Sequence, residues 1–232
     1  MNHQYQFLGQ GIYTVSEAAV LSGIAASKIS RWVRGYGSSH NRDANRMPAV
    51  FDREYPEIDG KTALSFLDLI EVRFVDWFRH HGVSWKSIRI AAERASYMLD
   101  TGHPFAKRQF FTDGKTILAR ISMDTGDTDL IDLVKQQYEM DRLVSPVLYG
   151  NLDFDTSGFA ERWWPRGRDG GIVIDPTLSF GQPVVEKFGV PTKILADAFQ
   201  TVKSEREVAD WYEVDVNSVK SALEFEQALL AA

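Results

Sequence analysis

Three basic residues stand at steps of three along one short stretch of the sequence, Lys28, Arg31 and Arg34. On a helix this spacing places them along a single stripe. The hydroxyl residues Ser27 and Ser30 flank the stripe. Basic and hydroxyl side chains bind phosphates and base edges, which is the chemistry needed to read the major groove of DNA. These five residues are therefore candidate DNA-binding residues.

The stretch from residue 14 to residue 34 predicts a helix-turn-helix that would position this stripe. Thr14 and Glu17 have the spacing of a capping box at a helix start. Gly23 suits the left-handed backbone that ends such a helix. The second helix would then bury the apolar residues opposite the stripe, which are Ile29, Trp32, Val33 and Tyr36. Many helix hairpins are only packing units and many Lys/Arg stripes only meet solvent, so this stretch alone leaves both interpretations open.

Residues 35–62 are rich in glycine, serine and asparagine and predict a basic loop. Short β segments are expected near 49–51, with an Asp-Gly turn at 59–60. In a winged helix this region would be the wing, whose arginines contact the phosphate backbone. Those arginines are Arg42, Arg46 and Arg53. A basic loop without a partner remains the other interpretation.

Two further helices are predicted next, at 65–81 and from Ser84 to about Leu99. Together with the hairpin they resemble the MerR-type winged helix-turn-helix, over residues 13–34, 66–74 and 81–89. In that family a recognition helix is followed by a wing, a helix, a Gly-x-Ser-x-x-x-Ile corner and another helix. The similarity covers about residues 11–100 and implies a DNA-binding domain at 1–103. No long dimerisation helix with an effector domain follows, in contrast to MerR regulators.

Residues 104–170 predict a β-hairpin and a connector. Asp113-Gly114 lies between two apolar segments and is typical of a type I′ hairpin turn. A short helix is expected over 129–138. Residues 150–170 would form an irregular connector around Trp163 and Trp164.

Residues 171–232 predict a separate unit made of a strand at 172–174, a turn-rich arm and three helices. The elements Asp-Pro, Phe-Gly-x-Pro-Val-Val and Val-Ala-x-x-Tyr occur in order over 171–228. In this order they resemble a small trihelical domain of unknown function found in VapB-type antitoxins. In those systems the domain accompanies a PIN-like toxin. We therefore expect a mainly α fold with small β elements, an N-terminal winged helix-turn-helix and a C-terminal trihelical, helix-turn-helix-like domain.

Charge is unevenly distributed along the 232 residues, whose formal net charge is −6. Residues 1–53 carry six Lys/Arg against three Asp/Glu, whereas residues 111–232 carry 12 against 21. A basic N-terminal segment and an acidic C-terminal part suit a protein that offers one face to DNA and another to a basic partner. The other interpretation is that the acidic surface only aids solubility. The absence of cysteine excludes disulfides and thiolate chemistry. With no signal-peptide pattern and no bilayer-length apolar run, we expect a cytoplasmic protein.

The two resemblances together imply an antitoxin of a type II toxin–antitoxin system. It would bind operator DNA as a homodimer, repress its own operon and neutralise a PIN-like nuclease. The alternative is a MerR-like regulator that binds a small-molecule effector near Trp163, Trp164 and Trp211. The sequence contains no nucleophile–base pair, metal-ligand cluster or phosphate-binding loop, so we expect neither catalysis nor a cofactor.

Overall fold

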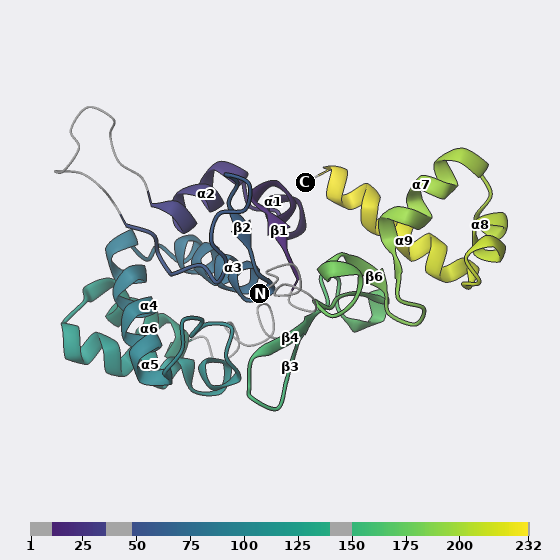
Figure 1. Cartoon of the computed structure of the whole chain (residues 1–232). Helices are drawn as coiled ribbons and strands as arrows, with labels where there is room; N and C mark the ends of the chain where they lie inside the picture. The colour runs from purple at the N-terminus through teal and green to yellow at the C-terminus, as the bar shows by residue number, and fades with distance from the viewer. Residues whose placement is uncertain (1–10, 36–47, 140–149, 232) are drawn as a thin grey trace. The chain divides into compact units, whose positions relative to one another are not determined.

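The computed structural model describes residues 11–35, 48–139 and 150–231 (Figure 1). The fold is mainly helical with two small sheets, which confirms the expected fold class. The chain divides into two compact units. We call residues 14–150 with 154–160 the hairpin unit, and residues up to 13 with 151–153 and 161–232 the trihelical unit. None of the described helices combines the length and apolar character needed to cross a membrane.

The hairpin unit begins with the predicted helix-turn-helix, formed by α1 (Val15–Ser22) and α2 (Ala26–Arg34). Thr14 Oγ1 accepts a hydrogen bond from Glu17 N at 3.2 Å, and Glu17 Oε2 accepts one from Thr14 N at 2.7 Å. This reciprocal capping box satisfies backbone donors that the first turn leaves unpaired. Gly23 ends α1 with φ 70°, and its N–H donates to Ala19 O. The turn therefore uses the left-handed conformation that glycine adopts without a steric penalty.

The short strand β2 (Ala63–Leu64) pairs with β1 (Tyr13–Thr14), and α3 (Phe66–His80) and α4 (Trp85–Leu99) follow. Both helices form where the sequence predicts them. Ser65 and Ser84 cap their starts, each accepting a hydrogen bond from a backbone N–H three residues later. The buried side chains recur at helical spacing along α3 and include Phe66, Leu69, Ile70, Phe74 and Phe78. The turn predicted at 59–60 is confirmed by positive φ at both residues, whereas no strand forms at 49–51.

The β-hairpin predicted within 104–170 is wrong, because its residues form the helix α5 (Arg108–Thr125). The buried residues Ile117, Leu118 and Ile121 follow Phe110 by seven, eight and eleven positions, which places all four on one helical face. Gly114 lies in the middle of this helix, and a Cβ at that position would be 3.3 Å from the ring of Phe110. Burial of one apolar face thus outweighs the local Asp-Gly turn signal. The helix predicted at 129–138 is confirmed as α6 (Thr128–Glu139).

A five-stranded sheet lies mostly in the trihelical unit, and its strands are neighbours in the order in which they occur along the chain. Only residues 154 and 160 of this sheet are assigned to the hairpin unit. Its strands are β3 (Leu152–Phe154), β4 (Ala160–Trp163), β5 (Ile172–Ile174), β6 (Pro183–Val185) and β7 (Val190–Pro191). From β4 to β7 the neighbours are antiparallel, with Ile172 opposite Val185. Two strands in the region predicted as an irregular connector therefore extend the sheet.

The three predicted C-terminal helices are present as α7 (Thr192–Val202), α8 (Glu205–Trp211) and α9 (Val216–Ala231). Ser204 caps α8 by accepting from Glu207 N, and Asp215 caps α9 by accepting from Ser218 N at 2.7 Å. The helices share a buried core with the sheet, centred on Ile172, Val185, Leu195, Val208, Val219 and Phe225. This shared core makes the sheet and the helices one folding unit.

The segment 11–13 also belongs to the trihelical unit, although it precedes the helix-turn-helix in sequence. Tyr13 Oη donates a hydrogen bond to Gly181 O at 2.9 Å, and Ile12 N donates to Phe180 O. Gly181 has φ 82°, and a Cβ there would collide with the Tyr13 ring. The close approach of these two segments therefore requires glycine.

Candidate nucleic-acid interface

The predicted basic stripe of α2 lies on the surface. Lys28, Arg31 and Arg34 are exposed, while Ile29, Trp32 and Val33 are buried. Ser27 is exposed and Ser30 is half-buried. Among the described residues, neither Lys28 nor Arg31 has an ion-pair partner, and Arg31 Nε makes only a long hydrogen bond of 3.4 Å to Ser27 O. Both cations are therefore available to a ligand.

Arg34 behaves differently from the other two cations of the stripe. Its Nε donates to Thr62 Oγ1, and its Nη2 lies 3.9 Å from Glu57 Oε1. These contacts tie the end of α2 to the segment before β2. Arg34 therefore acts first as a structural link within the hairpin unit.

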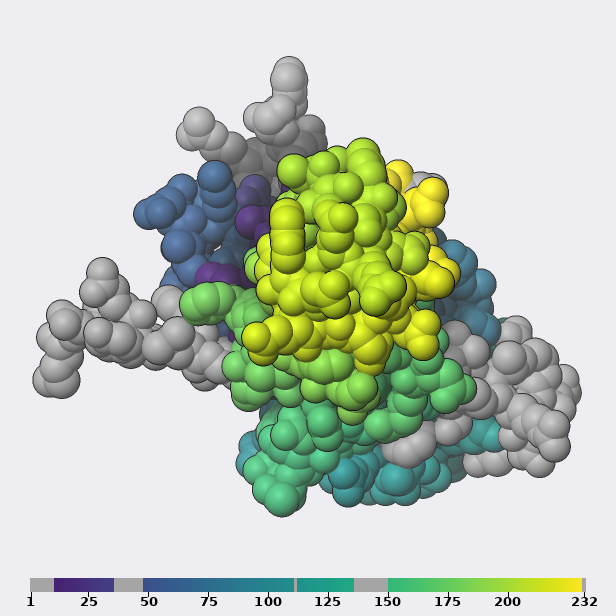
Figure 2. Space-filling model, turned by 90° about the vertical axis from the view of Figure 1, so that its right-hand side faces the viewer, coloured from purple at the N-terminus to yellow at the C-terminus, as the bar shows by residue number. Residues whose placement is uncertain are grey.

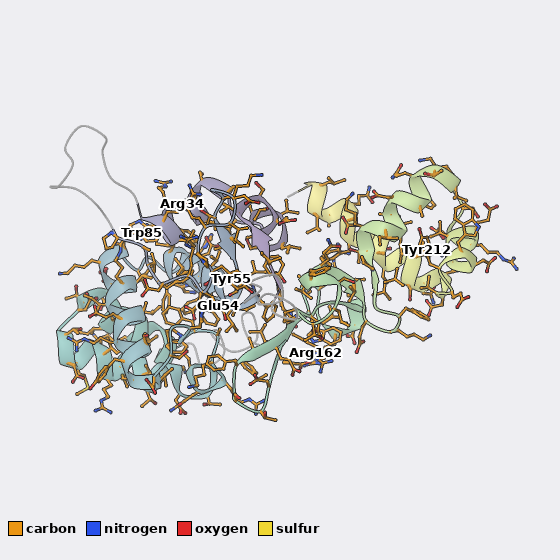
Figure 3. All side chains as sticks on the ribbon, in the orientation of Figure 1. Arg34, Glu54, Tyr55, Trp85, Arg162 and Tyr212 are labelled. Carbon is orange, nitrogen blue, oxygen red and sulfur yellow. The ribbon has the colours of Figure 1, made fainter. Side chains whose placement is uncertain are left out.

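A groove of about 330 Å³ runs beside α2, between this helix, the end of α3 and the beginning of α4. Figure 3 labels Trp85 and Arg34 in this part of the unit. The lining residues are Lys28, Arg31, Trp32, Asp76, Arg79, His80, Trp85 and Arg89. The structure thus brings two residues of the predicted stripe together with six residues from other positions.

Two indoles and two backbone carbonyls contact the guanidinium groups at the α3–α4 side of the groove. The ring centroids of Trp32 and Trp85 are 5.6 Å apart, and Arg79 Cζ lies 4.6 Å from the centroid of Trp85. Arg79 Nη1 also donates to Val83 O, and Arg89 Nη2 donates to Pro48 O at 3.0 Å. A hydrogen bond to a backbone carbonyl therefore holds each guanidinium group, and the Trp85 ring also supports that of Arg79. None of these contacts neutralises the positive charge.

The charge balance of the groove favours an anion. Four cationic side chains line it, against a single carboxylate. That carboxylate, Asp76, has His80 as a close neighbour, with His80 Nδ1 3.1 Å from Asp76 Oδ2. A concave surface with one dominant sign of charge concentrates ligands of the opposite sign. Phosphates of a nucleic acid fit this description.

Two carboxylates near the start of α6 bind the turn between α3 and α4. Asp129 of α6 accepts hydrogen bonds from Ser84 N and Ser87 Oγ, both at 3.0 Å, and Asp127 accepts a second one from Ser87 Oγ. The hydrogen bonds from Ser84 lower the pKa of the Asp129 carboxyl below its ordinary value. Carboxylates thus already occupy the first turn of α4, so phosphate contact at this corner depends on side chains such as Arg79 and Arg89.

The predicted wing arginines do not line the groove. Arg42 and Arg46, like Tyr36, lie outside the described residues. Arg53 is half-buried, and its Nη1 is buried with no hydrogen-bond partner among the described residues. Ser27, Ser30 and Arg34 also do not line the groove.

Sequence reasoning missed Arg79, Trp85 and Arg89, which flank the corner between α3 and α4. A signal was present, because these residues lie within a few positions of the Gly82-Val83-Ser84 turn. Cations on both sides of a helix–helix corner can converge in space even though they are far from α2 in sequence. Recognising this requires knowing that Trp85 packs against Trp32.

The second helix-turn-helix-like region, α8 with α9, has the opposite electrostatic character. Lys220, the only basic residue of α9, is 3.7 Å from Glu205. Asp215 lies at the start of α9. The pKa of its carboxyl is lowered to about 2, mainly because it accepts a hydrogen bond from the Lys187 side chain. A carboxylate that stays ionised at a helix start repels phosphate. This surface is therefore a poor DNA reader.

The tryptophans considered for an effector pocket lie in different surroundings. Trp163 and Trp164 are buried, and Trp164 Nε1 donates to Asp153 Oδ2 at 3.3 Å. Trp211 is exposed at the end of α8. The three indoles therefore do not share one enclosed space.

Comparisons with known proteins found a family, a curated relative and a solved structure that are similar to this chain. Residues 172–225 match the family described as "Protein of unknown function (DUF433)". The chain is 26% identical over 227 residues to the Mycobacterium tuberculosis protein named "Putative antitoxin VapB45", covering 92% of both chains. It also superposes on the crystal structure of Rv2018 from Mycobacterium tuberculosis with a TM-score of 0.67 and 21% identity, covering 91% of this chain and 96% of that one. The C-terminal region is thus similar to DUF433, and nearly the whole chain is similar in sequence to a protein named as an antitoxin and in fold to Rv2018.

Proposed function

We propose that this protein is the antitoxin of a type II toxin–antitoxin system, which binds operator DNA through the hairpin unit and neutralises a PIN-like nuclease through the trihelical unit. The observation that carries the DNA-binding part is the groove beside α2, where four cations face one carboxylate. The name of the relative from Mycobacterium tuberculosis supports the antitoxin part.

In the proposed complex α2 enters the major groove. Lys28 and Arg31 are exposed without ion-pair partners among the described residues, so they can reach base edges. Arg79 and Arg89 would contact the phosphate backbone beside the groove, because stacking and backbone hydrogen bonds fix their positions. Arg34 would hold α2 at the angle that this docking needs.

A single hairpin unit covers one half-site, and groove readers usually bind two half-sites about one helical turn apart. We therefore propose that a homodimer binds the operator. Light scattering of the full-length protein, alone and with operator DNA, should show two chains per complex. A monomer in both conditions contradicts this part of the proposal.

The toxin-binding role is assigned to the acidic C-terminal part of the chain. Residues 111–232 carry 12 Lys/Arg against 21 Asp/Glu. A nuclease must attract anionic RNA, which favours a basic rim around its active site, and charge complementarity would steer the acidic antitoxin to that rim. The arm from residue 176 to residue 191 is ordered by the sheet and by Tyr13, so it could obstruct the nuclease cleft.

The deciding experiment separates the two roles within the full-length protein. The double variant Lys28→Ala/Arg31→Ala is compared with the unchanged chain for binding to DNA from upstream of its own gene, and for rescue of growth when the neighbouring nuclease is expressed. We expect the variant to lose specific DNA binding and to keep growth rescue. Unchanged DNA binding would refute the assignment of α2, and loss of rescue without unfolding would refute the division of labour.

A further inference from the structure

The outer face of α8 combines exposed aromatic rings with carboxylates. Trp211 is 64% exposed and Tyr212 is 37% exposed. The indole N–H of Trp211 has no hydrogen-bond partner among the described residues. In Figure 2 the lime-to-yellow surface of the trihelical unit faces the viewer. Tryptophan and tyrosine combine an apolar ring with a polar group and are enriched at protein–protein interfaces, so two adjacent exposed rings make this face a candidate contact surface.

Three carboxylates surround these rings, those of Glu207, Asp210 and Glu213. All three residues are exposed, and none forms an ion pair with a described residue. Two aspartates of the same unit are paired, in Lys187–Asp215 at 3.0 Å and Lys193–Asp197 at 3.1 Å. We call Glu207, Asp210, Trp211, Tyr212 and Glu213 the α8 patch. Arg206 adds one exposed positive charge on the same helix, so the three carboxylates of the α8 patch leave an excess of negative charge there.

The local fold holds the α8 patch in a fixed position. Val208 and Ala209 are buried and anchor one side of α8, which turns Glu207, Asp210 and Trp211 outward at helical spacing. Tyr212 N donates to Val208 O at 3.1 Å, and Val214 N donates to Ala209 O at 3.0 Å. The exposed rings therefore sit on a hydrogen-bonded helix end, and little conformational entropy is lost when a partner covers them.

We propose that the α8 patch is the docking surface for a basic face of the partner nuclease, with Trp211 as its central anchor. This inference rests on the proposed antitoxin function and names the surface that performs it. A basic partner supplies lysine and arginine side chains for the three carboxylates and for stacking on the indole. Interface energy concentrates in aromatic anchors of this kind, while surrounding polar contacts exclude water.

The charge of the α8 patch argues against two other occupants. Nucleic acid would place phosphates against three unpaired carboxylates. A second copy of this chain, docked patch to patch about a two-fold axis, would place the same carboxylates against each other. A basic protein surface meets neither repulsion.

The test measures binding of the full-length chain to the protein encoded by the adjacent gene, which we propose to be the nuclease, by titration calorimetry. We expect Trp211→Ala to weaken nuclease binding by at least about 10-fold, as for a central interface anchor. Asp210→Lys should weaken it as well and reduce its dependence on salt. Leu230→Ser on α9 and Tyr97→Ala on α4 change side chains that are 90% and 87% exposed, so these matched controls should bind as the unchanged chain does.

Each outcome decides a separate point. Loss of nuclease binding by Trp211→Ala, with operator binding and thermal unfolding retained, supports the α8 patch. If the unchanged chain binds the nuclease and both α8 variants bind equally well, the patch assignment is wrong and the antitoxin function stands. If Trp211→Ala alters only the number of chains seen by light scattering, the surface is a self-interface and the inference is overturned. If the unchanged chain does not bind the nuclease at all, both proposals are wrong.

Discussion

The indole rings of Trp32 and Trp85 pack against each other with centroids 5.6 Å apart and planes inclined by 51°. This contact joins α2, which carries Lys28 and Arg31, to the start of α4. The same Trp85 ring supports the guanidinium of Arg79. The position of Arg79 relative to α2 therefore depends on this aromatic pair.

Replacing Trp85 tests this dependence directly. We expect Trp85→Ala to lower the free energy of unfolding by about 0.5–1.5 kcal/mol beyond the loss of buried area, which is the range for an aromatic pair. Operator affinity should fall as well, because Arg79 loses the ring beneath it. Trp85→Phe retains an aromatic face and serves as the control. Equal DNA affinity for all three proteins, measured by fluorescence anisotropy, would show that the stack does not position the cations.

Arg31 and Arg34 should respond differently to substitution even though both belong to the predicted stripe. Arg31→Ala should weaken specific operator binding by about 1–3 kcal/mol if this side chain reads a base. Arg34→Ala should chiefly reduce stability, because Arg34 is bound to Thr62 and Glu57. Competition binding against a scrambled operator, combined with thermal unfolding, separates the two effects. The reverse pattern would place base reading at Arg34.

Arg89 should contribute through phosphate contact. We expect Arg89→Gln to weaken binding similarly on all DNA sequences and to reduce the slope of log affinity against log salt by about 1. Arg120→Gln removes an exposed cation on α5 that does not line the groove, so its slope should stay unchanged. Identical slopes for the two variants would count against the groove as the phosphate site.

Asp68 gives a pH dependence of stability. Its side chain is fully buried, and burial raises the pKa of its carboxyl from 3.8 to about 6. The folded protein therefore holds this proton more tightly than the unfolded chain does. The resulting stabilisation is complete below about pH 3.8 and is lost as the pH rises through about 6.

Urea unfolding from pH 4 to pH 7 should isolate this contribution. Asp68→Asn keeps an oxygen that can accept from Ser65 N, but it cannot titrate. The stability of the unchanged protein relative to this variant should fall by roughly 2 kcal/mol over that range. Asp197→Asn, at an exposed ion pair on α7, serves as the control substitution. A constant difference for Asp68→Asn would mean that the buried carboxyl has an ordinary pKa.

Local signals in the sequence were sufficient for elements whose ends are capped and whose apolar faces are continuous. Thr14 with Glu17, Ser84 and Asp215 each mark a helix start that the structure contains. The failure at 108–120 has a physical cause, because an Asp-Gly pair is a strong hairpin signal only when the flanking residues alternate. Here the buried residues from Phe110 to Ile121 recur at helical spacing. Because burial of this face favours a helix, the segment is helical and not a β-hairpin.

The candidate site was only partly predictable for a related reason. A stripe of basic residues on one helix is visible in the sequence, so the sequence predicts Lys28 and Arg31, which line the groove. Whether a basic residue stays available depends on its neighbours in space, and Arg34 pairs with residues 57 and 62, more than 20 positions away. The contribution of Arg79 and Arg89 likewise arises from the packing of α3 and α4 beside α2.

The hydrogen bond from Tyr13 to Gly181 makes the hairpin unit an insertion in the topological sense. The trihelical unit begins before Thr14, is interrupted, and resumes at residue 151. A protein cut at the sequence boundary near residue 103 would therefore separate Tyr13 from the sheet that it supports. Conversely, joining residue 13 to residue 151 through a short linker would remove the groove beside α2. It would retain the hydrogen bonds from Tyr13 to Gly181 and from Ile12 to Phe180.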